Sequence, residues 1–242
     1  MSIRARNRQI RNTEAVWRRR AGFCKSIYTA VYSASQPHRN AAVRPLRPTD
    51  LTAIFEPLSI SGAYSVKSQP IEDERGWFSR AFCCQSFQEQ GISFNVSQAN
   101  RSFNRHSGTV RGFHFQFPPD AEQKLLRCTR GTLVDVVVDL RPESPTYLQW
   151  EMVELSERED IALLIPERCC HALQTQCDNT EIFYLVSAPY APSTEFGLRW
   201  DDPLLNIQWP STVSNISPKD AAWPHLSESE SMIAERMALP AT

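Results

Sequence analysis

Short apolar runs separated by turn signals fill the chain from residue 125 to residue 187. The clearest is 132–140, in which Val134, Val136 and Val138 recur at every second position. This period of two is typical of a strand, whose side chains point alternately to opposite faces of a sheet. The expected strands are 125–129, 132–140, 150–155, 161–165, 171–175 and 181–187. Strands that recur about every ten residues predict an antiparallel sandwich or barrel, and therefore an all-β fold.

Glycine and proline mark the turns between these runs. Arg130-Gly131 separates the first two expected strands and predicts a tight hairpin between them. Helix signals are few. The segment 79–90 is expected to form a short helix that ends before Gly91, and 227–239 is a second candidate.

Charge is unevenly distributed along the 242 residues, although the net charge is only −1. Residues 1–50 contain 11 Lys or Arg and 2 Asp or Glu, whereas residues 51–242 contain 15 and 25. We therefore predict a basic extension at 1–50 and one folded domain at 51–242. No apolar run approaches the length of about 18 residues that a membrane-spanning helix needs, so no contact with a membrane is expected.

The basic extension is rich in arginine, as in Arg18-Arg19-Arg20, and ends in the proline-containing stretch 37–48. This composition favours a disordered segment, because it offers little apolar surface to bury. It also resembles an organelle transit peptide, which leaves a targeting role open, whereas no apolar segment typical of a secretory signal follows the basic start. Among the closely spaced basic residues from 4 to 25, only Trp17 and Phe23 are aromatic, which argues against a nucleic-acid-binding arm.

Cysteine usage indicates a reducing compartment. The cysteines are Cys24, Cys83, Cys84, Cys128, Cys169, Cys170 and Cys177. Their number is odd and no Cys-x-x-Cys spacing occurs, so a disulfide or zinc framework is not expected and the cytoplasm is the favoured location. Cys170 directly precedes His171, and a cysteine beside a histidine can act as a nucleophile, but buried, unreactive cysteines are more common.

One histidine, His114, lies inside the strand-like segment 111–116, and Lys124 follows ten residues later. If the two residues lie on adjacent strands of a small barrel, both side chains can point into its cavity. There they would supply a base that works near neutral pH and a cation for an enolate. The alternative is a histidine that is simply packed in the core or at the rim.

The surroundings of His114 argue against a metal site. Metal-binding barrels of this kind usually provide a His-x-His pair, a carboxylate and a later histidine. In this chain Gln116 stands where the second histidine would be. A metal-dependent oxygenase or isomerase is therefore disfavoured, and no bound metal is expected.

A set of motifs runs in fixed order over residues 73–226. The segments are 73–76, 98–100, 110–116, 123–125, 131–141, 144–146, 165–167, His171, Tyr184, Glu195, 199–203, 207–210 and 217–221. Their residues, order and spacing resemble those of the dTDP-4-dehydrorhamnose 3,5-epimerase family, and this resemblance is far more specific than one short motif. It implies a double-stranded β-helix, the cupin-like jelly roll, with a few short helices.

The resemblance implies an isomerase of dTDP-rhamnose biosynthesis that epimerises the two carbons flanking the 4-keto group of a nucleotide-linked 6-deoxyhexose. His114 matches the base, and Asp220 matches the carboxylate paired with it. Tyr184 matches the acid on the opposite face of the sugar, and Lys124 matches the cation beside the enolate. No cofactor is required, because the ketone itself accepts the electron pair.

The resemblance also implies which residues bind the nucleotide-sugar substrate. They are Arg75, Arg111 and Lys219 for the sugar and diphosphate, Gln98 and Asn100 for the nucleotide, His171 and Glu195 for further ligand contacts, and Tyr190 for stacking on the base. Charge-assisted bonds to phosphate and stacking on an aromatic ring suit these residue types. A homodimer is implied as well, with Arg75 acting across its interface.

Each site residue also has a purely structural interpretation. Asp220 before two alanines is typical of a helix cap, and Tyr184 in an alternating strand is typical of packing. Their joint occurrence in the family's order favours the site. Near the nucleotide, Arg80, Ala99 and Pro189 depart from the family's usual residues. A different nucleotide or sugar is therefore our hypothesis, and the alternatives are a single-carbon epimerase and a non-catalytic nucleotide-sugar-binding jelly roll.

Overall fold

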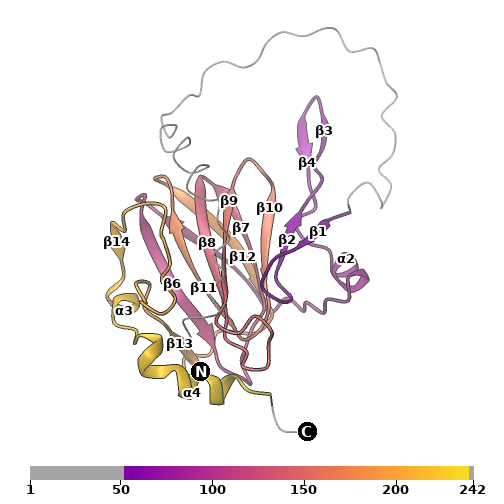
Figure 1. Cartoon of the computed structure of the whole chain (residues 1–242). Helices are drawn as coiled ribbons and strands as arrows, with labels where there is room; N and C mark the ends of the chain where they lie inside the picture. Colours follow the sequence, from indigo (N-terminus) through magenta and orange to yellow (C-terminus); the bar gives the residue numbers. More distant parts are fainter. Residues whose placement is uncertain (1–51, 240–242) are drawn as a thin grey trace. The chain divides into compact units, whose positions relative to one another are not determined.

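The computed structural model describes residues 52–239, and the predicted disordered extension at 1–50 lies outside this part of the chain. The domain boundary therefore stays a prediction. Within residues 52–239, two antiparallel sheets stand face to face, accompanied by a small hairpin and a few short helices (Figure 1).

The order of the strands defines the two sheets. The first sheet contains, in order, β1 (Ile54–Pro57), β2 (Tyr64–Lys67), β10 (Ile161–Ile165), β7 (Lys124–Arg130), β12 (Thr180–Val186) and β5 (Gln98–Asn104). The second contains β13 (Glu195–Gly197), β6 (Thr109–Gln116), β11 (Cys169–Thr175), β8 (Thr132–Asp139) and β9 (Trp150–Ser156), with β14 (Asn215–Ile216) parallel to β6. The separate hairpin is β3 (Ile71–Asp73) and β4 (Gly76–Phe78), and the helices are α2 (Cys84–Glu89), α3 (Pro218–Ala221) and α4 (Leu226–Met237). The predicted all-β jelly roll is confirmed.

The predicted hairpin at Arg130-Gly131 is wrong. All six expected strands exist, as β7 to β12, but β7 belongs to the first sheet and β8 to the second. Both edges of β7 are occupied by β10 and β12, and both edges of β8 by β11 and β9. Gly131, at a φ of +82°, therefore turns the chain from one sheet to the other instead of pairing consecutive strands.

The first predicted helix is shorter than expected, whereas the second is confirmed as α4. Only Cys84–Glu89 of the segment 79–90 is helical. The carbonyls of Arg80 and Ala81 accept tertiary hydrogen bonds, from Ser68 Oγ and Arg127 Nη2, so these residues are held outside the helix.

The core has three layers. Apolar side chains from both sheets, among them Leu126, Leu163, Val137 and Leu173, meet between the sheets. The outer face of the second sheet, including Phe113, packs under α4. The outer face of the first sheet packs against the aromatic side chains of α2 and the segment after it. Because the apolar filling between the sheets is incomplete, room remains there for a cavity.

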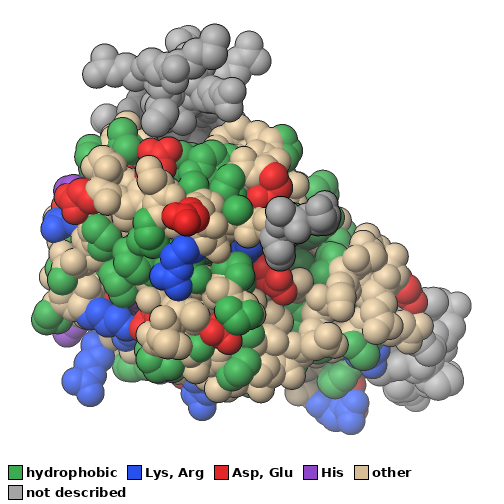
Figure 2. Space-filling model, turned by 90° about the horizontal axis from the view of Figure 1, so that it is seen from below, with side chains coloured by type: hydrophobic (Ala, Val, Ile, Leu, Met, Phe, Trp, Pro, Cys, Tyr) green, Lys and Arg blue, Asp and Glu red, His purple; other side chains and the backbone are tan. Residues whose placement is uncertain are grey.

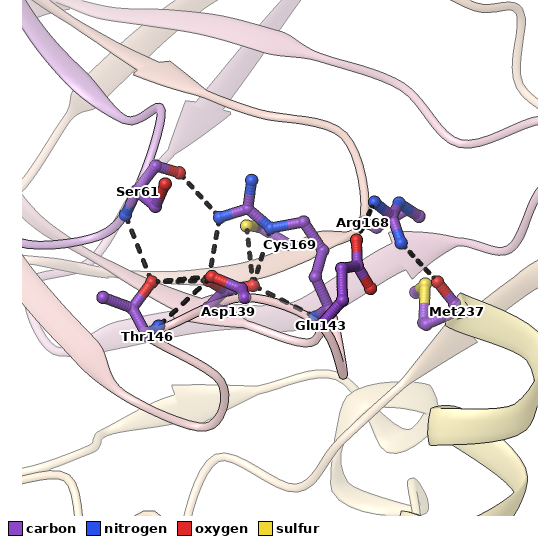
Figure 3. A network of polar contacts seen from close by, with 9 residues as sticks. Ser61, Asp139, Glu143, Thr146, Arg168, Cys169 and Met237 are labelled. Atoms are coloured by element: carbon purple, nitrogen blue, oxygen red, sulfur yellow. Dashed lines mark hydrogen bonds and ion pairs between the residues drawn. The ribbon is translucent and has the colours of Figure 1, made fainter. Parts of the chain in front are cut away.

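A buried carboxylate ties together the chain after β8. Asp139 has no exposed side-chain surface and accepts hydrogen bonds from Arg141, Ser144 and Thr146 (Figure 3). Burial alone would raise the pKa of Asp139, but these hydrogen bonds more than offset it and hold the pKa below its ordinary value. Arg141 also donates to the carbonyl of Ser61, so the network joins β8 to the turn before β2.

The surface carries mixed charges. Seen from below, acidic and basic side chains are interspersed with apolar ones (Figure 2). The acidic excess of residues 51–242 therefore does not gather into one patch on this face. No helix among the described residues has both the length and the apolar character needed to cross a membrane.

Candidate active site

A cavity of about 270 Å³ opens between the two sheets. The first sheet contributes Gln98, Asn100, Ser102, Lys124, Leu126, Ile182, Tyr184 and Val186. The second contributes Arg111, His114, Phe115, Gln116, His171, Leu173 and Glu195, and loops add Glu122, Ala188 and Tyr190. Nine of the twelve predicted site residues thus line one cavity, and its volume approaches that of small-ligand pockets.

A bulge in β6 turns two predicted site residues into this cavity. The register pairs His114 with His171 and Gly112 with Ala172, so β6 contains one extra residue, Phe113, at this point. Side chains normally alternate along a strand, but the extra residue allows Arg111 and His114 both to line the cavity.

Only glycine fits at position 112. Its φ is +118°, and a Cβ atom there would lie 2.5 Å from the carbonyl oxygen of His171 and 2.7 Å from Cα of Ala172. A side chain would push β6 away from β11 next to the two histidines. The glycine of the Arg-Gly-aromatic-His motif is therefore needed for the geometry of the site.

His114 forms a dyad with Asp220. Nε2 of His114 lies 2.7 Å from Oδ1 of Asp220, a side chain that is only 6% exposed. Burial alone would raise the pKa of Asp220, but the bonds with His114 and with the N–H of Gly112 hold it below its ordinary value. A carboxylate in this position fixes the tautomer with the proton on Nε2, which leaves Nδ1 as the basic nitrogen.

Asp220 is presented by a short helix. Ser217 is the N-cap of α3, and its hydroxyl accepts a hydrogen bond from the backbone N–H of Asp220. The interpretation of Asp220 as a helix cap is therefore wrong, because Ser217 fills that role. The carboxylate of Asp220 is left free to contact His114.

A second dyad lies beside the first. His171 Nδ1 lies 3.1 Å from Oδ2 of Asp135, whose side chain is fully buried on β8. His114 and His171 are cross-strand neighbours, so the two dyads stand next to each other on the second sheet. Sequence reasoning missed Asp135, although its position in the Val-rich strand at 132–140 marks it as a buried acid that needs a partner.

Tyr184 and Lys124 enter the cavity from the opposite sheet. Tyr184 lies on β12 and Lys124 begins β7, whereas His114 lies on β6. The expectation that His114 and Lys124 occupy adjacent strands is therefore wrong, since β6 and β7 belong to facing sheets. This arrangement still satisfies the chemistry, because a ligand between the sheets meets a histidine on one face and a tyrosine on the other.

Lys124 is buried beside a carboxylate. Burial lowers the pKa of Lys124 to about 8, against the opposing influence of Asp135, Cys170 and Glu195. Its Nζ forms an ion pair with Glu122, which sequence reasoning did not single out. At neutral pH the ammonium group is therefore still charged, in a place where water does not screen it.

Two buried polar atoms of the cavity have no hydrogen-bond partner within residues 52–239, namely Oε2 of Glu122 and Oγ of Ser102. The register pairs Ser102 with Ile182 and Lys124 with Val186, four residues apart on β12. Ser102 lies on β5, whereas Glu122 lies in the loop before β7, so the two atoms belong to different segments of the cavity wall. Such atoms are typical of a site built for a polar ligand.

A cluster of polar residues surrounds the mouth of the cavity. Glu195 accepts hydrogen bonds from Lys219 Nζ at 2.6 Å and from the hydroxyl of Tyr190 at 2.7 Å. Burial opposes it, but these bonds lower the pKa of Glu195. The N–H of Tyr190 donates to Oε1 of Gln98, and the Tyr190 ring stays 58% exposed. An exposed ring held in this way suits stacking on a nucleobase.

The remaining predicted residues occupy two different environments. Asn100 and Arg111 line the cavity, and Arg111 Nε donates to Asn104. Arg75 lies outside the cavity of its own chain, in the turn between β3 and β4, where its side chain is 84% exposed. Its role across an interface stays a prediction.

Gln116 is held by three backbone groups. Nε2 donates to the carbonyls of Asp120 and Pro189, and Oε1 accepts from the N–H of Ala191. The position that would carry a second histidine in a metal-binding barrel thus fastens the loop that carries Tyr190. Among residues 52–239, His, Cys, Asp and Glu side chains form no group of three or more suited to a metal ion.

The thiols next to His171 are not activated. Burial raises the pKa of Cys169 to about 12 and raises that of Cys170 well above its ordinary value. Both side chains are buried, and neither lines the cavity. A nucleophilic role for either cysteine is therefore disfavoured.

Comparison with known proteins decides the family. A family model described as dTDP-4-dehydrorhamnose 3,5-epimerase matches residues 57–228. The chain belongs to this family. A dTDP-4-dehydrorhamnose 3,5-epimerase from Sinorhizobium fredii is 41% identical over 175 residues, which cover 72% of this chain and 90% of that protein.

Solved structures of the family share the fold. A 3,5-epimerase from Legionella pneumophila, in complex with dTDP-4-keto-L-rhamnose, matches with a TM-score of 0.70 and 30% identity over 75% of this chain and 96% of that chain. A 3'-monoepimerase from Streptomyces bikiniensis, in complex with dTDP-quinovose, matches with a TM-score of 0.68 and 34% identity over 74% of this chain and 90% of that chain. The family therefore includes enzymes named for one epimerised carbon and for two.

Proposed function

We propose that this protein epimerises the carbons flanking the ketone of a nucleoside-diphosphate-4-keto-6-deoxyhexose. The observation that carries the proposal is the placement of His114 and Tyr184 on facing sheets of one cavity, with Lys124 in the same cavity. Inversion at carbon requires proton removal from one face and proton return to the other. Relatives named for this reaction support the proposal.

Each residue has a chemical role in the proposed reaction. Nδ1 of His114 takes the proton from the carbon beside the ketone, and the electron pair of the C–H bond moves to the ketone oxygen to form an enolate. The Lys124 ammonium stabilises this oxyanion, and Asp220 stabilises the imidazolium. Tyr184 then donates its proton to the opposite face of the same carbon, and solvent restores both groups. The ketone oxygen accepts the electron pair of the C–H bond, so none of these steps requires a cofactor.

The nucleotide and diphosphate are assigned to the mouth of the cavity. Tyr190 offers a ring for stacking on the base, with Gln98 and Asn100 as polar neighbours. Lys219 and Arg111 supply the positive charge that a diphosphate requires. Glu195 holds both Lys219 and Tyr190, and His171 faces the sugar from beside His114.

We assign Arg75 to the cavity of a second copy of the chain, in a homodimer. The hairpin β3–β4 extends away from the two sheets (Figure 1) and carries Trp77 and Phe78, which are 66% and 55% exposed. A two-stranded hairpin with exposed aromatic side chains is marginal alone, and a partner surface would stabilise it. The turn of the hairpin would deliver Arg75 to the partner's substrate.

Free thiols such as those of buried Cys169 and Cys170 fit the cytoplasm as the compartment.

Solvent exchange tests the reaction. The purified protein is incubated in deuterated water with 4-keto-6-deoxyglucose linked to dTDP, UDP, CDP or GDP, and deuterium at the two carbons beside the ketone is followed by NMR. We expect exchange in the native protein and a loss of at least about 10²-fold in His114→Ala, the usual lower effect of removing a general base. The labelled positions also report whether one or both carbons react. Absence of exchange with all four substrates would support the non-catalytic binding module instead.

A further inference from the structure

Glu122 has an unexplained free oxygen inside the cavity. It lies two residues before Lys124, and its side chain is only 8% exposed. One carboxylate oxygen, Oε1, contacts Nζ of Lys124, whereas Oε2 is buried without a hydrogen-bond partner in the described part of the chain. A buried carboxylate oxygen that lacks a partner is costly, so a structure that retains one in a cavity indicates a missing donor.

Three donor side chains that line the same cavity already have other partners. His114 is bonded to Asp220, His171 to Asp135, and Arg111 to Asn104. The missing donor is therefore best supplied by the ligand. In a 4-keto sugar nucleotide the ketone and the phosphates only accept hydrogen bonds, whereas the sugar hydroxyls donate them. A hydroxyl of the sugar is thus the group that matches Oε2.

The other oxygen of Glu122, Oε1, restrains the position of the Lys124 ammonium group. A lysine ammonium sits on a flexible four-carbon stem, and its position must be fixed if it is to meet an enolate oxygen. The ion pair with Glu122 supplies this restraint at the start of β7. Burial favours loss of the lysine proton, and a carboxylate in direct contact opposes that loss.

We propose that Glu122 is both a sugar-binding residue and the residue that positions Lys124. Oε1 holds the ammonium group, and Oε2 accepts a hydrogen bond from a sugar hydroxyl. The sugar-binding half rests on the proposed function, whereas the positioning half concerns the protein alone. Because one carboxylate makes both contacts, it fixes the position of the Lys124 ammonium group relative to the bound sugar.

Other titratable groups near Lys124 are left unchanged in the test. Asp135 on β8, Cys170 on β11 and Glu195 on β13 act on the pKa of Lys124, and the other titratable side chains of the cavity wall include His114, Arg111, His171 and Tyr184. Among them, Asp135 and Glu195 act on Lys124 through space, whereas Glu122 is in direct contact. Removing the charge of Glu122 takes away the carboxylate in direct contact with Nζ, so Lys124 should lose its proton more easily.

The first test compares Glu122→Gln with Glu235→Gln, an exposed position on α4. We expect Glu122→Gln to raise KM for the nucleotide-linked keto sugar by on the order of 10-fold or more, since a hydrogen bond to a charged acceptor is lost. It should leave the affinity for dTDP alone unchanged, because dTDP carries no hexose. An unchanged KM, or an equal loss of dTDP affinity, would overturn the sugar contact.

Substrate analogues give a stricter test of that contact. Each analogue lacks the hydroxyl at carbon 2 or at carbon 3 of the hexose. For one of them, Glu122→Gln and the native protein should show the same KM, because the hydroxyl that Oε2 binds is already absent. If the variant is impaired to the same extent on both analogues and on the full substrate, Oε2 does not bind a sugar hydroxyl.

The positioning role is tested without turnover. The Nζ protonation of Lys124 is followed by NMR of its ε-carbon in labelled protein as the pH is raised, with Lys124→Met to assign the signal. We expect Lys124 to lose its proton at lower pH in Glu122→Gln than in the native protein, and at nearly native pH in Glu122→Asp, which keeps the charge and also serves if Glu122→Gln folds poorly. Equal titration in all three proteins would refute the positioning role. If the native protein exchanges no substrate proton, the proposed function fails, while this titration still decides the positioning role.

Discussion

His114 and Asp220 are 106 positions apart in the sequence, yet Nε2 of one lies 2.7 Å from Oδ1 of the other. The first belongs to β6 of the second sheet and the second to the short helix α3. The proposed base therefore depends on the packing of the C-terminal segment against the sheet. The tautomer of this base is fixed by a residue that does not line the cavity.

Asp220→Asn should abolish most of the exchange activity while leaving nucleotide binding intact. An amide can present its N–H to the ring and favour the wrong tautomer, and it cannot stabilise the imidazolium. We expect a loss of at least about 10²-fold in kcat, measured by deuterium exchange, with dTDP affinity unchanged in a calorimetric titration. Asp178→Asn, at an exposed position, is the matched control. Native-like kcat in Asp220→Asn would refute the dyad.

The rate of exchange should fall as the pH rises through about 8, the pKa of Lys124. The enolate needs the charged ammonium, so activity is present below this pKa and is lost above it. Lys124→Arg should be slower at pH 7 but should lack the decline near pH 8, because a guanidinium stays charged. A rate that is constant from pH 7 to 9.5 in the native protein would contradict this role of Lys124.

Gly112→Ala should destabilise the protein and impair the site together. The added Cβ would approach the backbone of His171 and Ala172 at distances that real Cβ atoms do not adopt, and the φ of +118° adds strain. We expect a loss of about 1–3 kcal/mol in the free energy of unfolding, together with reduced exchange in the fraction that stays folded. Gly91→Ala is the control, since its φ is +74° but no atom lies within 4 Å of the added Cβ. It should cost less and keep native exchange.

Asp139→Asn should destabilise the protein by about 3 kcal/mol in urea unfolding at pH 7. The largely buried guanidinium of Arg141 would lose the carboxylate of Asp139 as its ion-pair partner. The folded-state pKa of Asp139 lies below its ordinary value of 3.8, so its contribution is present above that pH and is lost as the pH falls further. The difference between variant and native protein should therefore shrink below pH 3.8. Glu143→Gln, whose side chain is 44% exposed, should cost at most about 1 kcal/mol.

Mixing two inactive variants tests whether Arg75 acts across a dimer. In a heterodimer of Arg75→Ala and His114→Ala, one cavity has both residues native if Arg75 comes from the partner, and neither cavity does if it acts within its own chain. Equal mixing after dissociation and reassembly should then restore about a quarter of the native exchange rate, since half of the dimers have one working cavity of two. No recovery, with dimers present by size-exclusion chromatography, would place Arg75 outside the partner's site.

The sequence was most informative where periodicity was strong. All six strands expected between residues 125 and 187 exist, because their apolar residues fill the space between the sheets or the outer layers. The edge strand β5 was not expected, since its polar side chains line the cavity and break the alternation. The error at Arg130-Gly131 has a similar cause, because a turn motif specifies the reversal of the chain but not the sheet that receives the next strand.

The candidate site was predicted through residue types and their order, but the partners of those residues were not. Asp135 and Glu122 act on His171 and Lys124 through contacts that only the fold creates. The bulge at Gly112 likewise brings Arg111 and His114 to one face, against the simple alternation of a strand. Such long-range pairings leave no local signal in a single sequence.

Gln116 holds a loop in a way that a metal-binding histidine could not. Its amide fastens the loop at residues 189–191, and that loop carries Tyr190, which lines the cavity. A Gln116→His change would recreate the His-x-His pair of metal-binding barrels, but an imidazole cannot replace all three hydrogen bonds of the amide. Gaining a metal ligand at this position would release the loop at residues 189–191. Position 116 can therefore carry a metal-binding histidine or the amide that holds this loop, but not both.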